Sequence, residues 1–228
     1  MVDRQAVQAD GPGEGLTEAA APTAPLALLT AWVDAAVARG GERGDGPGAV
    51  SMALATVDAS GAPNVRPVML RFLTADGPAF VTDLGSTKAA ELAANPAAAL
   101  TLAWPAMFRS IRFRGRVRDV EPDLIADYFR SRPWQARIAA WASAQSEPIA
   151  DRSALESAYA AAAARWPDTG SPGDVPLPAR WGGYRLIPDE VEFWAGRASG
   201  LHDRIAYSRA GAGTMADPGA WRRHRRQP

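Results

Sequence analysis

The 228-residue sequence has no cysteine, which excludes disulfides, thiolate nucleophiles and cysteine-based metal sites. It has only two histidines and no H-E-x-x-H pattern, so it offers no recognisable set of metal ligands. No apolar run approaches the roughly 18 residues of a membrane span, and the N-terminus lacks the basic-then-apolar pattern of a signal peptide. We therefore expect a cytoplasmic protein with no membrane partner and no bound metal.

Net charge and nucleotide-binding motifs are also missing. The 25 Lys and Arg residues balance the 25 Asp and Glu residues, so no global field attracts nucleic acid. There is no G-x-S-x-G elbow, no Walker loop and no G-x-G-x-x-G fingerprint. Lysine is nearly absent, and Lys88 is the only one. A lysine that persists in an arginine-rich chain is a hint that an ammonium group is needed at that position.

Hydrophobic periodicity divides the chain into an arm and one domain. Residues 1–24 have no apolar period and are predicted to be disordered, whereas residues 25–228 are predicted to form a single domain. A Gly-rich connection is expected at residues 39–48. The predicted helices cover residues 25–38, 86–94, 121–129, 136–143 and 151–165. The predicted strands cover residues 51–58, 64–73, 79–82, 97–104, 111–120, 183–187, 191–194 and 205–209.

Short strands with interspersed helices predict a mainly β fold with flanking helices (α+β), built as a small antiparallel barrel. Pro67 predicts an edge strand or a bulge, because proline cannot donate to the ladder. Residues 97–104 are apolar almost throughout, which predicts a strand that is buried on both faces. Asp151 is expected to cap the helix that follows it. The basic residues 221–228 favour a closing strand or an exposed terminus over a nucleic-acid tail.

The predicted strand 111–120 carries a basic stripe. Ile111, Phe113 and Val117 alternate with arginines, so the two sets face opposite sides of the sheet. A basic stripe is compatible with nucleic-acid binding. Zero net charge and the lack of aromatics between the arginines favour a solvated or partner-facing surface instead. The arginines of the stripe are Arg112, Arg114, Arg116 and Arg118.

The stretch 192–204, E-F-W-A-G-R-A-S-G-L-H-D-R, concentrates unusual side chains. Trp194, His202 and Arg204 at one turn could hold a flat, charged ligand by stacking and charge-assisted hydrogen bonds. A core tryptophan followed by an exposed turn is an equally good interpretation. Other residues suited to a phosphorylated planar ligand are spread over the chain. They are Arg66, Arg71, Thr82, Lys88, Arg132, Gln145 and Ser146.

In combination, seven segments make the sequence resemble the pyridoxamine 5′-phosphate oxidase family of FMN-dependent enzymes, over about residues 25–228. The segments are R-P-V-M-L-R (66–71), L-G-S-T-K-A-A-E-L (84–92), N-P-A-A-A-L (95–100), Y-F-R-S-R-P (128–133), A-W-A-S-A-Q-S (140–146), V-P-L-P-A-R-W-G-G-Y-R (175–185) and E-F-W-A-G followed by L-H-D-R (192–204). The resemblance implies an FMN-binding split β-barrel that works as a homodimer, with FMN in the groove between the subunits.

The resemblance also assigns roles to residues. Arg71, Tyr128 and Arg132 match contacts to the substrate phosphate, and His202 matches a residue close to the substrate ring and is the catalytic candidate. Positions that match FMN contacts are Arg66, Pro67, Val68, Met69, Leu70, Arg71, Val81, Thr82, Lys88, Gln145, Ser146, Trp194 and Arg204.

The implied reaction is oxidation of a primary amine or alcohol with O₂, which gives pyridoxal 5′-phosphate and hydrogen peroxide from pyridoxamine or pyridoxine 5′-phosphate. Two other interpretations stay open. One is a relative that oxidises another planar metabolite, as the flavin oxidases of phenazine biosynthesis do. The other is a non-catalytic protein that binds FMN or pyridoxal phosphate.

The main departures from the family pattern lie at positions that would contact the substrate. Gly200 stands where the family usually has an arginine that covers the substrate, and Ala136 stands where a serine completes the phosphate site. Arg197, three residues before Gly200, is a candidate replacement for that arginine. Further departures are Ser110 for a glutamine near the flavin, Thr87 for the arginine of S-R-K and Ala195 for the glutamine after the tryptophan.

Overall fold

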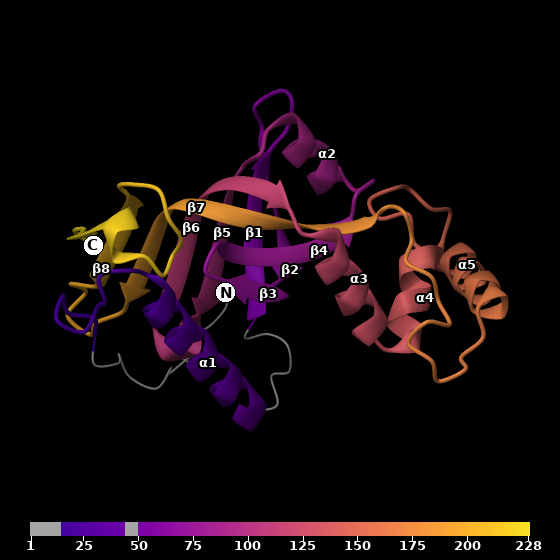
Figure 1. The fold of residues 1–228 in the computed structure, drawn as a ribbon, viewed down its shortest axis with the longest axis horizontal. Coiled ribbons are helices and arrows are strands. Elements are labelled where there is room, and N and C mark those ends of the chain that lie inside the picture. The colour runs from indigo at the N-terminus through magenta and orange to yellow at the C-terminus, as the bar shows by residue number, and fades with distance from the viewer. Residues whose placement is uncertain (1–14, 44–49) are drawn as a thin grey trace, which may run out of the picture.

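One antiparallel sheet of nine strands forms the centre of the protein in this computed structural model, which describes residues 15–43 and 50–228 (Figure 1). The strands are β1 (Ser51–Val57), β2 (Pro63–Met69), β3 (Phe72–Thr74), β4 (Gly77–Asp83), β5 (Ala97–Trp104), β6 (Arg109–Asp119), β7 (Trp181–Ala195), β8 (Asp203–Arg209) and β9 (Trp221–Arg225). The helices are α1 (Leu26–Arg43), α2 (Thr87–Ala94), α3 (Pro122–Ser131), α4 (Trp134–Ala142) and α5 (Arg152–Arg165), with short 3-10 turns η3 (Pro105–Met107) and η4 (Pro218–Ala220). The predicted class, mainly β with flanking helices, is confirmed.

The sheet curls into a barrel because its two edges are consecutive in the chain. The strand order is β2-β1-β5-β6-β7-β4-β3, with β8 and β9 continuing from β7. Leu70 and Arg71 join β2 to β3. Leu70 N donates to Val50 O at 2.8 Å on one side, and Arg71 N donates to Ala79 O at 2.9 Å on the other. The predicted strand 64–73 is therefore two strands, and Pro67 lies on an edge strand as predicted.

Strand β7 is the longest element of the sheet and pairs with β4, β6 and β8. Two separate strands were expected at residues 183–187 and 191–194, but Pro188 lies at a register shift and leaves the strand continuous. Opposite this point, a Cβ on Gly115 would lie 2.1 Å from Ile187 O, so the close approach of β6 and β7 requires glycine. Figure 1 shows β7 crossing the width of the molecule.

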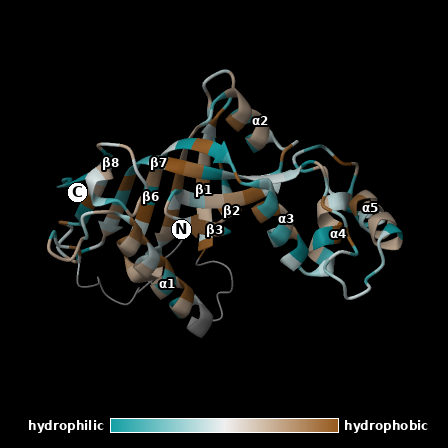
Figure 2. Cartoon of the chain, in the orientation of Figure 1, coloured by the Kyte–Doolittle hydropathy of each residue, from teal (hydrophilic) through white to brown (hydrophobic). Residues whose placement is uncertain are grey.

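The main core lies inside the curled sheet, where α1 also packs, and Figure 2 shows hydrophobic residues concentrated on these strands. Phe113 and Ile111 of β6 are fully buried and the arginine stripe faces the other way, as predicted. Strand β5 is not buried on both faces. Leu100 and Leu102 are fully buried, but Ala97, Ala99 and Ala103 on the outer face lie half-buried or exposed.

The helices differ from expectation mainly at their ends. Helix α1 continues to Arg43, through two glycines, so the predicted connection at residues 39–48 begins later, and residues 44–49 lie outside the described residues. A glycine costs a helix only about 1 kcal/mol, which the packing of α1 offsets. Asp151 caps α5 as predicted, since its Oδ1 accepts a hydrogen bond from Ala154 N at 2.8 Å.

Residues 15–24 correct the prediction of a disordered arm to residue 24. Leu16 is 3% exposed and belongs to the main core, and Tyr207 Oη donates to Pro22 O at 2.7 Å. These contacts reach residues of β8 and β9 nearly 200 positions away, so no local pattern signals them. Residues 1–14 lie outside the described residues. Within residues 15–43 and 50–228, no helix has the length and apolar content needed to cross a membrane.

Candidate functional site

Lys88 lies at the centre of a buried polar cluster at the start of α2. Its Nζ donates to Thr82 Oγ1 at 3.0 Å, to Ser86 Oγ at 3.1 Å and to Gln145 Oε1 at 2.5 Å. Thr82 Oγ1 also donates to Gln145 Oε1 at 2.9 Å. Strand β4, helix α2 and the segment after α4 thus bring three predicted residues together. The exposed Gln145 leaves this cluster open on one side.

Arg66 on β2 lies next to this cluster and is held by Glu91. Its NH2 donates to Glu91 Oε2 at 2.7 Å, and its NH1 donates to Thr56 Oγ1. Asn64 Nδ2 donates to the other carboxylate oxygen of Glu91 at 2.8 Å. Burial alone would raise the pKa of Glu91, but the hydrogen bonds from Thr56, Asn64 and Arg66 outweigh it and lower the pKa. Glu91 therefore stays ionised and fixes the guanidinium.

Two cations lie close enough to interact in this region, and both are largely shielded from solvent, since Lys88 is 9% exposed and the Arg66 side chain 18%. Burial lowers the pKa of the Lys88 ammonium, and the positive charge of Arg66 lowers it further. A phosphate placed between these groups would relieve the repulsion and accept several charge-assisted hydrogen bonds. The positive charges of Lys88 and Arg66 are therefore placed to suit an anion, and their role in binding one stays a prediction.

A second cationic group lies between α3 and the start of β7. Tyr128 stacks on Trp181 with ring centroids 6.0 Å apart and planes 9° from parallel. The Arg71 guanidinium lies 5.7 Å from the Tyr128 ring centroid, and that of Arg132 lies 4.9 Å from the Trp181 centroid. Arg132 NH1 is buried without a hydrogen-bond partner. Burial lowers the pKa of Arg132, and the charge of Arg71 acts in the same direction.

An unpaired buried guanidinium N–H is costly, so the Arg132 donor is one that a bound anion could satisfy. This observation fits the role in substrate-phosphate binding that the resemblance implies for Arg71, Tyr128 and Arg132. Ala136 is half-buried on α4 and supplies no hydroxyl there.

The third group lies at the far end of β7. Trp194 pairs with Arg204 across β7 and β8, and its ring centroid lies 4.9 Å from that of His202. Trp194 is only half-buried, so the interpretation as a core tryptophan is wrong. Arg204 NH2 donates to both carboxylate oxygens of Glu192 at 2.9 Å. Glu192 thus fixes the guanidinium beside the indole.

His202 has a defined hydrogen-bond orientation. Its Nδ1 accepts a hydrogen bond from the main-chain N–H of Arg197 at 3.1 Å. In the neutral imidazole the proton is therefore on Nε2, where it can be donated to a ligand. The Arg197 guanidinium donates to Asp203 Oδ2 at 2.6 Å, so covering a substrate in place of the family arginine would require it to leave Asp203. That replacement stays a prediction.

A cavity of about 600 Å³ opens beside Trp194. Arg112, Arg204 and Glu192 lie along it with Ser110, one of the departures from the family pattern. Pro228 also lines it, and Gln227 O accepts a hydrogen bond from Arg204 NH1 at 3.0 Å. Ser110 is therefore placed where its hydroxyl can face a ligand next to the indole.

The first and third groups cannot form one site within a single chain. Thr82 pairs with Gly182 near the start of β7, whereas Arg204 pairs with Trp194 near its end. At about 3.3 Å per residue, roughly 40 Å of strand separates these two points. Figure 1 shows the same separation, with α3, α4 and α5 on one side and β8 with the C-terminus on the other.

The remaining predicted residues differ in their exposure and lie in several elements, most of them between β2 and β4. Val68 and Leu70 are buried in the core, Met69 and Val81 are half-buried, and Pro67 is exposed. Ser146 is exposed and has φ of 77°, a left-handed conformation that is uncommon for a residue with a side chain. Thr87 is the first residue of α2, and Ala195 is buried. The roles of all these residues stay predictions.

The sequence analysis did not identify the residues whose contacts fix the positions of the predicted site residues. Ser86 binds Lys88, Glu91 fixes Arg66, Glu192 fixes Arg204, and Trp181 stacks with Tyr128. Only two of them had a local signal. Glu91 follows Lys88 by three positions on α2, one helical turn, and Glu192 precedes Trp194 by two on β7, the same-face spacing of a strand.

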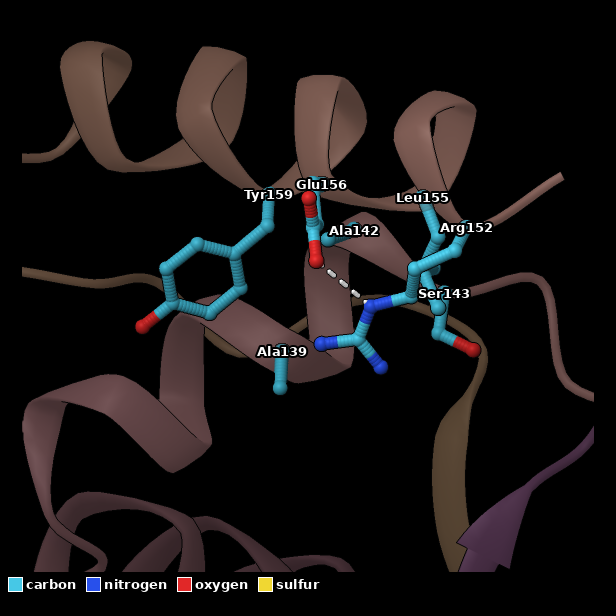
Figure 3. A pocket seen from close by; sticks show the side chains of 7 residues that line it. All are labelled: Ala139, Ala142, Ser143, Arg152, Leu155, Glu156 and Tyr159. Atoms are coloured by element: carbon cyan, nitrogen blue, oxygen red, sulfur yellow. Dashed lines mark hydrogen bonds and ion pairs between the residues drawn. The ribbon is translucent and has the colours of Figure 1, made fainter.

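A separate cavity of about 380 Å³ lies between α4 and α5 (Figure 3). Its lining is mainly apolar and includes Ala139, Leu155 and Tyr159, and the exposed Arg152–Glu156 ion pair lies at it with Nε and Oε1 2.6 Å apart. None of the predicted site residues lines this cavity. It therefore lies apart from the candidate site.

The architecture defines a class of protein, a split β-barrel with a buried lysine and an arginine near one end of a long strand and an aromatic, arginine-lined cavity at the other. Residues 47–165 match the family described as Pyridoxamine 5'-phosphate oxidase, and residues 181–228 match the one described as Pyridoxine 5'-phosphate oxidase C-terminal dimerisation region. The chain belongs to the pyridoxamine 5′-phosphate oxidase family.

Relatives agree with this assignment over nearly the whole chain. The pyridoxine/pyridoxamine 5′-phosphate oxidase of Pseudomonas putida (strain W619) is 45% identical over 85% of this chain and 87% of its own length. That of Pseudomonas entomophila (strain L48) is 44% identical over 94% of both chains.

A solved structure of PhzG from Burkholderia lata 383, in complex with tetrahydrophenazine-1-carboxylic acid, superposes with a TM-score of 0.81 at 28% identity. It covers 96% of this chain and 100% of its own. An FMN binding protein from Nostoc punctiforme PCC 73102 shares the fold, with a TM-score of 0.65 at 20% identity over 86% of this chain and 95% of its own.

Proposed function

We propose that this FMN-dependent oxidase of the pyridoxamine 5′-phosphate oxidase family converts pyridoxine or pyridoxamine 5′-phosphate to pyridoxal 5′-phosphate. The alcohol and O₂ give the aldehyde and hydrogen peroxide; the amine, O₂ and water give the aldehyde, ammonia and hydrogen peroxide. The observation that carries the proposal is Arg132, whose buried, unpartnered N–H lies beside Arg71 and Tyr128. A substrate phosphate would supply the missing acceptor.

The residues present fit FMN. Lys88 and Arg66 provide a fixed ammonium and a fixed guanidinium for its phosphate, and Thr82 adds a hydroxyl. Trp194 and Arg204 line a cavity that suits a flat ring system. When bound, FMN supplies the chemistry by accepting a hydride from the substrate and passing the electrons to O₂.

The protein's own contribution is binding, orientation and hydrogen bonding. His202 presents Nε2–H beside Trp194, which suits a hydrogen bond to the polar edge of a substrate ring. The chain's residues are thus suited to hold a substrate against a cofactor.

A homodimer would bring the two ends of β7 together. In a two-fold dimer, the Lys88 end of one subunit can face the Trp194 end of the other, and each of two equivalent sites then contains both groups. The match of residues 181–228 to a dimerisation region supports this arrangement, since that region contains Trp194, His202 and Arg204.

The second candidate function is oxidation of a planar metabolite of the phenazine type. Its support is the similarity to PhzG together with Gly200, where the usual substrate-covering arginine is absent and nothing lies within 4 Å of a Cβ built on the backbone. The higher identity to the two Pseudomonas oxidases, 45% and 44% against 28%, favours the vitamin B6 substrate.

Oxygen consumption by the FMN-loaded protein tests the choice. We expect turnover with pyridoxine and pyridoxamine 5′-phosphate at micromolar KM and none with a dihydrophenazine carboxylate. The reverse preference would support the phenazine-type oxidase. Bound flavin with no turnover of either substrate would support a non-catalytic binding protein.

A further inference from the structure

Asp203 lies where three segments of the chain meet: residues 15–24, the turn before β8, and β9. Its carboxylate is buried, with the residue 6% exposed, and it accepts hydrogen bonds from Leu16 N at 2.9 Å, Arg197 Nε at 2.6 Å and Arg225 NH1 at 2.6 Å. Burial alone would raise its pKa, but the hydrogen bonds from Leu16, Arg225 and Arg197 outweigh burial and lower it. An ionised carboxylate with three donors is a fixed point in the fold.

One of the three segments is residues 15–24, which we call the strap. The side chain of Leu16 is in the core, and Leu16 O accepts a hydrogen bond from Arg225 NH2 at 3.0 Å. Glu18 of the strap binds the same guanidinium, with Oε1 2.6 Å from Nε and Oε2 2.9 Å from NH2. Arg225 thus joins the strap to Asp203.

The second segment is the turn that carries the candidate catalytic residue. Arg197 makes two different contacts in this turn. Its side chain binds Asp203, and its main-chain N–H binds His202 Nδ1. A shift of Arg197 would therefore change both the position of the imidazole and the hydrogen bond that keeps the proton on Nε2.

The position of Asp203 in the sequence links it to the cofactor end as well. It lies between His202 and Arg204 at the start of β8, where successive side chains face opposite sides of the sheet. Its carboxylate consequently faces the strap, whereas Arg204 lines the cavity and His202, just before the strand, contacts Trp194. Fixing Asp203 from behind fixes the main chain on which both predicted site residues stand.

We propose that Asp203 is a positioning residue, held by the strap through Arg225 and Leu16, that sets His202 through Arg197 and Arg204 through the main chain. Asp203 touches neither substrate nor cofactor in this proposal. The activity readout rests on the oxidase function proposed above, whereas the flavin readout does not.

The sharpest test loosens the strap without touching the core. Glu18→Gln removes one exposed carboxylate charge from Arg225, and Glu156→Gln makes the same change in an exposed Arg–Glu pair on α5 with the same Nε to Oε1 distance of 2.6 Å. Both glutamates are mostly exposed, at 56% and 63%, so both variants should fold. Asp203→Asn is the stronger variant at the centre of the network.

We expect Glu18→Gln to lower kcat/KM by a factor of about two to five, the range of an exposed ion pair, and Asp203→Asn to lower it at least about tenfold. Both should alter the visible circular dichroism of bound FMN, because Trp194 and Arg204 belong to the affected end. Glu156→Gln should match the wild type in both measurements.

Two results would overturn the inference. One is an Asp203→Asn variant with a lower Tm but unchanged kcat, KM and flavin dichroism, which would make Asp203 purely structural. The other applies if Asp203→Asn does not fold, because Glu18→Gln then decides. If Glu18→Gln and Glu156→Gln have the same kcat/KM and the same flavin dichroism, the inference is overturned. If wild-type protein binds FMN but oxidises neither B6 substrate, the proposed function fails, and the flavin dichroism of Glu18→Gln still decides about the strap.

Discussion

Lys88 Nζ and Gln145 Oε1 are 2.5 Å apart, although 57 positions separate the two residues in the chain. The contact joins α2 to the segment after α4, and Gln145 forms the exposed side of the Lys88 cluster. The only lysine of the protein therefore lies where three oxygen acceptors and a neighbouring guanidinium surround it.

Replacing Lys88 tests the anion site. We expect Lys88→Met to weaken FMN binding about ten- to hundredfold, because a charge-assisted hydrogen bond contributes about 1.5–3 kcal/mol. Lys88→Arg keeps the charge and should lie between wild type and Lys88→Met. Quenching of free-flavin fluorescence measures the affinity, and an unchanged dissociation constant in Lys88→Met would remove Lys88 from the cofactor site.

Replacing Arg132 tests whether this residue binds the substrate phosphate. Arg132→Met should raise KM for pyridoxine 5′-phosphate about ten- to hundredfold, since one charged hydrogen bond is lost, and should leave FMN affinity unchanged. Unphosphorylated pyridoxine is the control substrate, and its oxidation should be equally poor in both proteins. Equal loss with both substrates would show that Arg132 does not read the phosphate.

Complementation tests the shared site. Lys88→Met and Trp194→Ala should each be nearly inactive, but dimers formed from a mixture of the two should recover activity. With random pairing, half of the dimers are mixed and each has one intact site, so about a quarter of wild-type activity is expected. Mixing after denaturation and refolding gives this measurement. No recovery would contradict a site that Lys88 of one subunit and Trp194 of the other share.

Two variants of Gly200 test backbone strain and substrate contact separately. Its φ of +79° is left-handed, so Gly200→Ala should cost about 1 kcal/mol of the free energy of unfolding, while open space around it prevents a clash. Gly200→Arg should carry the same cost and, if the position faces substrate, lower KM for pyridoxamine 5′-phosphate. Thermal unfolding and oxygen uptake on both variants measure the two effects; equal KM in both variants would exclude the contact.

The stability that the Glu18–Arg225 ion pair gives to the folded state should depend on pH. The Arg225 guanidinium lowers the pKa of Glu18 from 4.5 to about 2. A lowered carboxyl pKa stabilises the folded state above pH 4.5, and this stabilisation is lost as the pH falls through about 2. The Tm difference between wild type and Glu18→Gln should therefore be largest above pH 4.5 and shrink between pH 4.5 and 2. A constant difference would exclude this ion pair as its source.

Local patterns predicted much of this protein. Alternation in residues 111–120 gave the correct faces of β6, Pro67 indicated an edge strand, and Asp151 indicated the start of α5, because each depends on neighbours along the chain. The strap could not be predicted in this way. A single apolar residue, Leu16, has no period, and its partners lie in β8 and β9.

The sequence by itself determined the fold class, the family and the types of side chain available for binding, since composition, periodicity and motif spacing are properties of the chain. Tertiary structure alone decided which residues act together. Long-range pairing placed Lys88 with Gln145, left Arg132 with a buried free N–H and put Trp194 at the opposite end of β7. Such relations depend on the three-dimensional course of the sheet, which no stretch of sequence specifies locally.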